Sequence, residues 1–218
     1  MSKRDILNRI RSSLNRDGPL PPGVSEGLRT RLNTAQLHVR PAFAPDTAAR
    51  FEQKLIGVAG SVERCTAGSG IAEAVQRYLE EHDLPPEIVV SDDELVGAVS
   101  WSNQLSVKRG RPDPSDVTSV TGAFAAIAET GTVVLLSSPE SPTTLNLLPE
   151  NHIVAVRKEH IVRHQEEVWS ALRRRAGGMP RTVNLITGPS RTGDVEQVLQ
   201  LGAHGPRQLH VLVVDETS

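Results

Sequence analysis

Glu129 is the residue of this 218-residue sequence that stands out most clearly as able to do chemistry. It is the only charged side chain after Asp116 in the segment Asp116–Ser137, whose other residues are apolar, hydroxyl-bearing or glycine. A carboxylate buried without partners in such a segment would cost several kcal/mol. Glu129 is therefore expected either at the mouth of a cleft, as a ligand contact or general base, or in a turn that it stabilises with backbone N–H groups and the hydroxyls of Thr130 and Thr132. The residues alone leave both interpretations open.

The second set of candidate residues lies in Gly188–Gly193 (Gly-Pro-Ser-Arg-Thr-Gly), which follows an expected strand and opens an expected helix over 190–201. In open α/β sheets, ligands gather at the carboxyl ends of strands. Free backbone N–H groups at such a place, with the hydroxyls of Ser190 and Thr192 and the guanidinium of Arg191, could bind a phosphate or a carboxylate.

An alternative explanation of this segment needs no ligand. Asp194 and Glu196 would lie in or next to the first turn of the expected helix, where they would offset the positive end of the helix dipole. In that case the segment is a capped helix start in which Arg191 pairs with one of the two acids.

Three histidines have positions that could matter for chemistry. His204, in Gly202–Pro206 directly after the expected helix, could shuttle protons near physiological pH, although a histidine in a surface turn is the commoner case. His160 and His164 have the i, i+4 spacing of a helical metal-binding pair. Two ligands without a third are too weak a pattern, and no metal site is predicted.

The elements that must position these residues follow from the hydrophobic pattern. The β-branched flanks of the central segment predict a strand, a turn with Glu129 and Gly131, and a second strand. Other expected strands are 61–66, 87–90, 152–156, 182–186 and 209–214, and the expected helices are 71–82, 92–99, 160–176 and 190–201. This alternation of short apolar strands with helices predicts an α/β fold with a mostly parallel sheet covered on both faces.

The first 45 residues are expected to lie outside the globular domain, which we assign to residues 46–218. They begin with an amphipathic helix over 2–15 and continue as a Pro- and Arg-rich arm with a turn of helix near 27–32. Residues 1–40 contain eight Lys or Arg and three Asp or Glu, a net charge of 8 − 3 = +5. Such an arm could contact another subunit or an acidic partner, or its helix could pack on its own domain.

Composition excludes several classes of protein. A net charge of −2 gives no indication of nucleic-acid binding, and no segment approaches the roughly 20 apolar residues of a membrane span. Cys65 is the only cysteine, so neither an internal disulfide nor a four-cysteine iron–sulfur cluster can form. The charged start of the sequence has no apolar signal core. The expected location is the cytoplasm, and no cofactor is expected in this chain.

Three segments, in this order, resemble the lactate utilisation protein C family (LutC/YkgG, the LUD domain). Ala126–Leu135 resembles the hallmark segment of that family, and Asn146–Val154 resembles its LLPP-x-HI-V element. Thr187–Glu196, followed by Gly202–Pro206, resembles its GPSRTADIE and G-x-HGP elements. The resemblance extends over roughly residues 51–215.

The resemblance implies a three-layer α/β/α sandwich with a mostly parallel sheet, of the NagB/RpiA/CoA-transferase-like kind. It also implies a subunit of a cytoplasmic system that oxidises L-lactate to pyruvate, with iron–sulfur partner proteins that hold the clusters. It favours Glu129 as the catalytic residue. It further favours binding of a small anionic ligand by the residues around the two candidate segments, namely Thr130, Gly131, Thr132, Gly188, Ser190, Arg191, Thr192 and His204.

Two other functions stay open. A CoA-transferase-like or other small-anion-handling enzyme could use Glu129 as its nucleophile, since some CoA transferases use a glutamate. That resemblance is at the level of the fold and is weak support for chemistry. A non-catalytic ligand-binding or regulatory module is favoured by the lack of a clear set of acid, base and nucleophile. In each case the N-terminal arm could join copies into a homo-oligomer.

Overall fold

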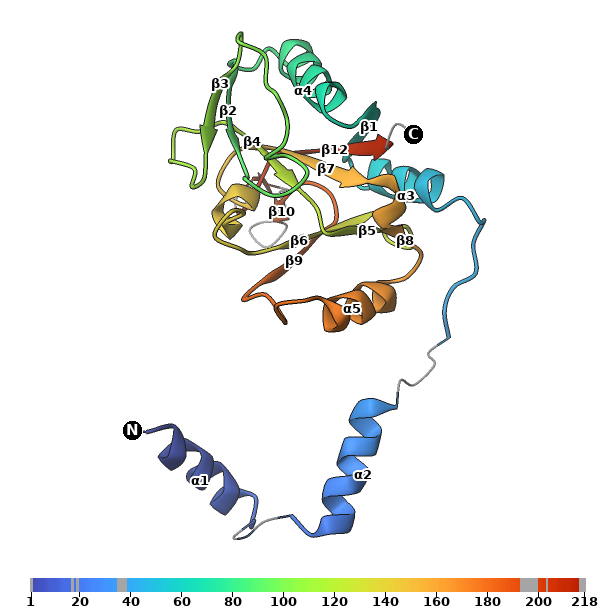
Figure 1. Ribbon diagram of the computed structural model, residues 1–218, viewed down its shortest axis with the longest axis vertical. Helices are drawn as coiled ribbons and strands as arrows, with labels where there is room; N and C mark the ends of the chain where they lie inside the picture. Colours follow the sequence, from blue (N-terminus) through green and yellow to red (C-terminus); the bar gives the residue numbers. More distant parts are fainter. Residues whose placement is uncertain are drawn as a thin grey trace. The chain divides into compact units, whose positions relative to one another are not determined.

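The computed structural model describes residues 2–16, 18, 20–34, 39–192, 200–202 and 204–215 (Figure 1). The chain divides into two compact units, Met1–Arg40 and Pro41–Ser218. Within the described ranges, no helix is long and apolar enough to cross a membrane.

The first unit contains two helices, α1 (Lys3–Ser13) and α2 (Pro22–Asn33). The helix predicted at the start of the chain is confirmed, and it begins at a capping box in which Ser2 and Asp5 each accept a hydrogen bond from the other's backbone N–H. α2 is longer than the single turn expected near 27–32, because its prolines stand at the N-cap and first positions, where a missing N–H is tolerated. The exposed apolar side chains of this unit include Ile6, Leu7, Ile10, Leu14, Val24 and Leu28.

A six-stranded parallel sheet forms the centre of the second unit (Figure 1). In spatial order its strands are β1 (Ser61–Thr66), β12 (Gln208–Asp215), β7 (Asn151–Arg157), β4 (Thr118–Gly122), β2 (Glu87–Val90) and β3 (Ser106–Arg109). Every neighbouring pair is parallel. The strands predicted from short apolar runs in this sheet are confirmed, and so is the mostly parallel arrangement.

A smaller mixed sheet accompanies the large one. Its strands, in spatial order, are β8 (Ile161–Val162), β5 (Ala125–Ile127), β6 (Thr132–Leu136) and β9 (Val183–Ile186). β8 runs parallel to β5, whereas β5, β6 and β9 pair antiparallel. The predicted strand–turn–strand of the central segment is thus the β5–β6 hairpin, preceded by β4 of the large sheet.

In the described part of the chain, three helices cover these sheets. α4 (Ser69–Glu81) packs on one face of the large sheet. α3 (Thr47–Ile56) and the small sheet share an apolar core with its other face, and α5 (Gln165–Arg174) covers the outer face of the small sheet. The predicted α/β sandwich is confirmed, with strands as well as a helix on one covered face.

Strand β7 shows why the large sheet has continuous apolar strands. Ile153 and Ala155 pack toward α4, whereas Val154 and Val156 pack toward α3 and the small sheet. All four side chains are fully buried, because successive residues of a strand point to opposite faces and both faces are covered.

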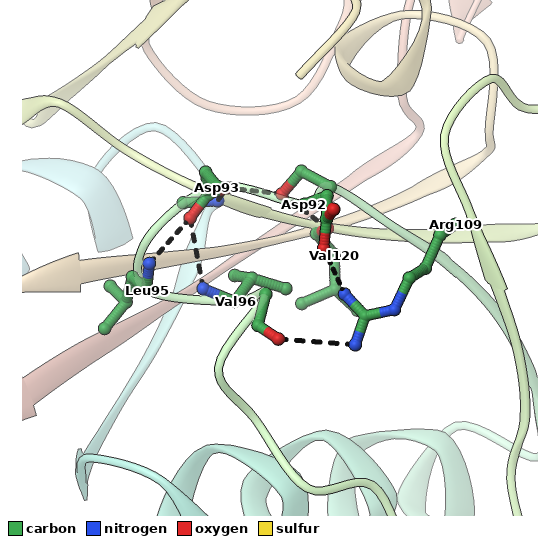
Figure 2. Close-up of polar contacts among 9 residues, drawn as sticks. Asp92, Asp93, Leu95, Val96, Arg109 and Val120 are labelled. Carbon is green, nitrogen blue, oxygen red and sulfur yellow. Dashed lines mark hydrogen bonds and ion pairs between the residues drawn. The ribbon is translucent and has the colours of Figure 1, made fainter. Parts of the chain in front are cut away.

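Residues 92–99 form turns in place of the expected helix (Figure 2). Asp93 Oδ1 accepts hydrogen bonds from the N–H groups of Leu95 and Val96 at 3.0 Å each, as a helix cap would. Its Oδ2, however, accepts from the N–H of Gly122 at 2.8 Å. The carboxylate therefore fixes this loop to the end of β4, and the cap does not lead into a helix.

The helix expected over 160–176 begins later than predicted. Residues 158–160 form a 3-10 turn, β8 follows, and α5 starts only at Gln165. His160 and His164 consequently lie in different local structures, and their spacing is not that of a helical pair.

The helix expected over 190–201 is wrong at both of its described ends. β10 (Arg191–Thr192) pairs antiparallel with β11 (Gln200–Leu201), and the carbonyl of Ser190 accepts a hydrogen bond from the N–H of Gly202 at 3.1 Å. These cross-connections replace the i to i−4 bonds of a helix. The residues between the two strands lie outside the described part of the chain, among them Gly193, Asp194 and Glu196.

Candidate functional site

Glu129 lies in the turn between β5 and β6, as predicted. Gly131 in this turn is buried with a φ of +73°, and a Cβ there would lie 2.5 Å from the backbone nitrogen of Leu55 in α3. Only glycine accommodates both the positive φ and this close approach. The N–H of Glu129 donates to the carbonyl of Arg163 at 3.1 Å, which fixes the turn against the segment after β8.

The carboxylate of Glu129 pairs with a histidine. Nδ1 of His164 lies 3.1 Å from Oε2 of Glu129, and the side chains are 9% and 28% exposed respectively. His164 precedes α5, and its backbone N–H donates to Oε1 of Glu167 at 3.0 Å. The pairing depends on the parallel contact of β5 with β8. A strand as short as β8 leaves no periodic signal, so sequence reasoning missed this partner.

Phe43 covers the imidazole of His164. The two rings meet edge to face with centroids 5.3 Å apart. The guanidinium of Arg163 lies over the Phe43 ring at 4.6 Å and donates to the Phe43 carbonyl at 2.7 Å. These contacts restrict the rotation of the imidazole, so the Glu129 carboxylate is held in one orientation.

The hydroxyls expected around Glu129 bond to one another. Oγ1 of Thr130 lies 2.6 Å from Oγ1 of Thr132, which lies 2.6 Å from Oγ1 of Thr187. No hydrogen bond joins Glu129 to either neighbouring threonine in the described part of the chain. The expectation that Glu129 ties its turn through these hydroxyls is therefore wrong, because the hydroxyls form a chain toward β9.

This cluster borders an open pocket of about 510 Å³. The lining residues are Lys54, Val58, Glu129, Thr130, Thr132, Gln165, Leu185 and Thr187. The pocket thus has a carboxylate that can accept a proton, a primary amine and hydroxyls that can both donate and accept hydrogen bonds. That set can bind and orient a small polar ligand.

A second pocket, of about 100 Å³, contains the other predicted residues. Its lining consists of Asn146, Leu147, Ile186, Gly188, Ser190, His204, Gly205, Pro206 and Leu209. Leu185 and Thr187 line the first pocket, while Ile186 and Gly188 line the second. Alternate residues of β9 and its extension face opposite sides, as in any strand, so the two candidate segments border different pockets.

The two remaining predicted residues lie in β10. Arg191 is exposed, and neither pocket has it in its lining. Thr192 pairs with Gln200 through the backbone, and its side chain lies outside the described part of the structure. The structure therefore gathers Gly188, Ser190 and His204, but it leaves Arg191 at the surface.

Asn146 is a site residue that sequence reasoning missed. Its side chain is 1% exposed, and its Oδ1 has no hydrogen-bond partner among the described residues. A buried amide oxygen without a partner costs about 1–3 kcal/mol, so most such groups are satisfied. Asn146 borders the small pocket, and a bound molecule there would supply the partner. The sequence signal was present, since Asn146 begins the second of the three quoted segments.

Comparisons with known proteins place these residues in a family context. The model of the LUD domain family matches residues 115–214, a range that includes the Glu129 turn and the segments that line the small pocket. An uncharacterized protein of Neisseria meningitidis is 40% identical over 147 residues, which are 67% of this chain and 63% of that protein.

Two further matches extend over more of the relatives' lengths. Lactate utilization protein C of an Exiguobacterium species is 27% identical over 228 residues, covering 98% of this chain and 96% of that protein. The crystal structure of a DUF162 family protein from Deinococcus radiodurans superposes with a TM-score of 0.57 at 21% identity, covering 80% of this chain and 99% of the other. That structural match supports the fold alone.

Proposed function

We propose that this chain, whose residues 115–214 match the model of the LUD domain family, acts in lactate utilization as a subunit of the system that oxidises L-lactate to pyruvate. One observation carries the proposal: the alignment with lactate utilization protein C of Exiguobacterium extends over nearly the full length of both chains. An alignment of that extent includes the N-terminal helices as well as the α/β unit.

The oxidation step needs electron carriers that this chain does not provide as a cysteine-bound cluster. Cys65 is its only cysteine, and burial raises the pKa of its thiol to about 11. At neutral pH this group is a thiol and a poor metal ligand. We therefore assign the clusters to iron–sulfur partner proteins in the cytoplasm and assign ligand handling to this chain.

Within this role, we assign proton acceptance to Glu129 and ligand contact to the groups around it. The carboxylate is oriented by His164 and faces the pocket that Lys54 and Thr132 also line. A base that is held in place by a second group acts without first being reordered. Gly188, Ser190 and His204 bind a small polar ligand in the neighbouring pocket.

The arm of residues 1–40 is assigned to contact with a second copy of the chain. Its net charge is +5, so residues 41–218 carry −2 − 5 = −7. α1 has 11 residues and no buried side chain among those described. Isolated helices of fewer than ~12–15 residues are marginal in water, so this one needs a surface that covers its apolar stripe. An oppositely charged copy of the α/β unit offers such a surface.

A bacterial strain that grows on L-lactate through this system tests the proposal. Deletion of the gene should abolish growth on L-lactate and leave growth on pyruvate intact, and the wild-type gene should restore it. Tagged protein from lactate-grown cells should bring down iron–sulfur proteins. Unimpaired growth on lactate after deletion, with the chain recovered as a lone monomer, would contradict the proposal.

Acyl transfer is a second candidate function, favoured by the partly exposed, pocket-facing carboxylate of Glu129. In that reaction a carboxylate oxygen attacks the carbonyl of an acyl-CoA thioester, forms an acyl–glutamyl anhydride and releases CoA as its thiolate. Incubation with acetyl-CoA followed by intact mass measurement would reveal an acetyl adduct, absent in Glu129→Gln and present in the exposed control Glu140→Gln. No adduct and no acyl exchange would remove this candidate.

A further inference from the structure

The carboxyl ends of β2 and β4 form a crevice at which the connections of the large sheet diverge. β2 and β4 are neighbours. The chain leaves β2 toward β3 at the edge of the sheet, whereas after β4 it forms the β5–β6 hairpin of the small sheet and only then enters β7, on the other side of β4. In open α/β sheets, ligands bind in the crevice at such a point. Neither Glu129 nor Gly188 lies there.

One wall of this crevice is rigid. Asp93 accepts four hydrogen bonds, from the hydroxyl of Ser91 and the N–H groups of Leu95, Val96 and Gly122 (Figure 2). A Cβ on Gly122 would lie 2.3 Å from Oδ1 of Asp93, so this set of hydrogen bonds requires glycine at position 122. Because both carboxylate oxygens are occupied by protein donors, Asp93 positions the wall and is not itself a ligand-binding group.

The loop that forms this wall is also hydrogen-bonded to β3, the strand at the edge of the sheet. Arg109, at the end of β3, donates from Nη1 to Oδ1 of Asp92 at 2.6 Å and from Nη2 to the carbonyl of Gly97 at 3.3 Å (Figure 2). The loop after β2 is thereby fixed to both of its neighbouring strands, β3 and β4.

The opposite wall is basic. The crevice contains a pocket of about 250 Å³ that is lined by Asp93, Glu94, Leu95, Gly122, Ala123, Phe124, Leu136, Ser138, Ser141, Arg157, His160 and Arg175. Arg157 ends β7, His160 ends the 3-10 turn that follows, and Arg175 follows α5. Three basic groups, two from the stretch 157–160 and one from the end of α5, thus converge on one pocket.

An acidic side chain at the rim competes for Arg157. Nη2 of Arg157 lies 3.2 Å from Oε1 of Glu94, whose side chain is 93% exposed. An ion pair with so exposed an acid contributes roughly 0–1 kcal/mol, so a ligand carboxylate can replace Glu94 at small cost. Ser138 Oγ accepts from the N–H of Ser141 at 3.0 Å, and because no described residue accepts its own hydrogen, that hydrogen can be donated to a ligand oxygen.

We propose that this pocket binds a small carboxylate that has an oxygen on the adjacent carbon, with the carboxylate on Arg157 and Arg175 and the second oxygen at Ser138. Guanidinium groups match carboxylates in charge and in planar geometry. The volume lies below the roughly 300–1,000 Å³ of pockets that hold drug-sized ligands, so a three-carbon acid fits better than a large cofactor. The site itself is independent of the proposed function, but the choice of L-lactate and pyruvate as probes depends on it.

Calorimetric titration of the purified full-length protein tests the inference. Sodium L-lactate or sodium pyruvate should bind saturably, whereas sodium chloride and sodium phosphate at equal ionic strength should not. Arg157→Gln and Arg175→Gln should each weaken binding by about tenfold or more, the loss expected for one charge-assisted hydrogen bond. Lys158→Gln is the matched control, since Lys158 adjoins Arg157 but pairs with Asp215, and it should bind as the wild type does.

Glu94→Gln distinguishes a binding role for Arg157 from a structural one. Because it removes the competing carboxylate, it should bind the ligand as tightly as the wild type or more tightly, whereas a site that needs the Glu94–Arg157 pair would lose affinity. The inference is overturned by absence of saturable binding, by binding of phosphate alone, or by unchanged affinity in folded Arg157→Gln and Arg175→Gln. If the deletion strain grows normally on lactate while the protein still binds the ligand, the proposed function is contradicted and the binding site is supported. If growth on lactate is lost but no saturable binding is found, the binding site is contradicted and the proposed function is supported.

Discussion

His152 should make the stability of this protein fall with pH from about 6.5 downward, so that the loss begins above the range in which carboxylates titrate. Its side chain is fully buried in β7, with Nε2 2.7 Å from Oγ1 of Thr121. Burial disfavours the charged imidazolium and lowers the pKa of His152 from 6.5 to about 3. The folded protein therefore keeps this histidine neutral throughout the mildly acidic range.

The sign of the effect follows from the two states. Below its ordinary pKa of 6.5 the histidine of the unfolded chain binds a proton, whereas the folded chain does not bind it until the pH approaches about 3. Acid therefore favours unfolding, and stability is lost as the pH falls from 6.5 toward 3. One pH unit is worth about 1.4 kcal/mol, so pH 5, which lies 1.5 units below 6.5, costs about 2 kcal/mol.

Urea unfolding at pH 7 and pH 5 measures this loss. His152→Gln removes the titrating group and retains a side-chain amide near Thr121, so its stability should fall by about 2 kcal/mol less than that of the wild type between the two pH values. Val154→Ala, a buried truncation on the same face of β7, controls for general destabilisation and should keep the full pH dependence. His210, whose pKa burial lowers to about 4, adds a similar loss to every one of these proteins. Equal pH dependence in the wild type and His152→Gln would refute the reasoning.

Three further outcomes are expected. Gly131→Ala should lose about 2–5 kcal/mol, because it adds left-handed strain of roughly 1–2 kcal/mol to a clash with Leu55 of roughly 1–3 kcal/mol. Gly178→Ala has a matching φ of +75° with nothing within 4 Å, and a similar loss in urea unfolding would contradict the clash. Glu129→Gln should have a free energy of unfolding within about 1 kcal/mol of that of the wild type, the scale of one weakened hydrogen bond, yet it should fail to restore growth on L-lactate. Full growth would contradict the catalytic assignment. Removal of residues 1–40 should leave a folded α/β unit with a smaller mass by light scattering, whereas an insoluble product would mean that the arm belongs to the core.

The sequence predicted most of the large sheet because its strands are buried on both faces. Residues 152–156 of β7 and 209–214 of β12 are short runs that are apolar apart from one histidine each, and burial of both faces leaves few other arrangements. The turn at Gly131 was also predictable, since a glycine between two β-branched runs marks a positive φ. These signals are local, and they predicted the structure correctly because the long-range contacts of the fold favour the same local conformation.

The errors arose where a long-range contact overrides a local signal. Asp93 has the position of a helix cap, but its second oxygen binds the N–H of Gly122, 29 residues away along the chain. Ser190 precedes a segment with good helical composition, yet its carbonyl accepts from Gly202 and its N–H donates to Pro206. Spacing within one segment carries no information about such partners.

The pairing of Glu129 with His164 was not predicted from the sequence for a similar reason. In the sequence, His164 was assigned to the expected helix over 160–176, where it would lie one turn from His160. In the structure, β8 interrupts that helix and brings residues 163 and 164 beside the turn. The two residues of β8 pair with β5 through backbone hydrogen bonds, and residues with almost any side chain can form such bonds. The sequence of β8 therefore carries no sign of this pairing.

The segment Asn146–Val154 contains two buried polar groups, of which one has a structural role and the other has a proposed functional role. Nδ1 of His152 and Oδ1 of Asn146 both have no hydrogen-bond partner among the described residues. His152 is surrounded by the sheet core, and its cost appears as the depressed pKa that makes the protein acid-sensitive. Asn146 borders a pocket of about 100 Å³, several times the ~30 Å³ that one water occupies in the liquid, so its partner can be a bound molecule. An unsatisfied group beside such a space indicates a ligand, whereas one enclosed by apolar side chains indicates only the energetic cost of burial.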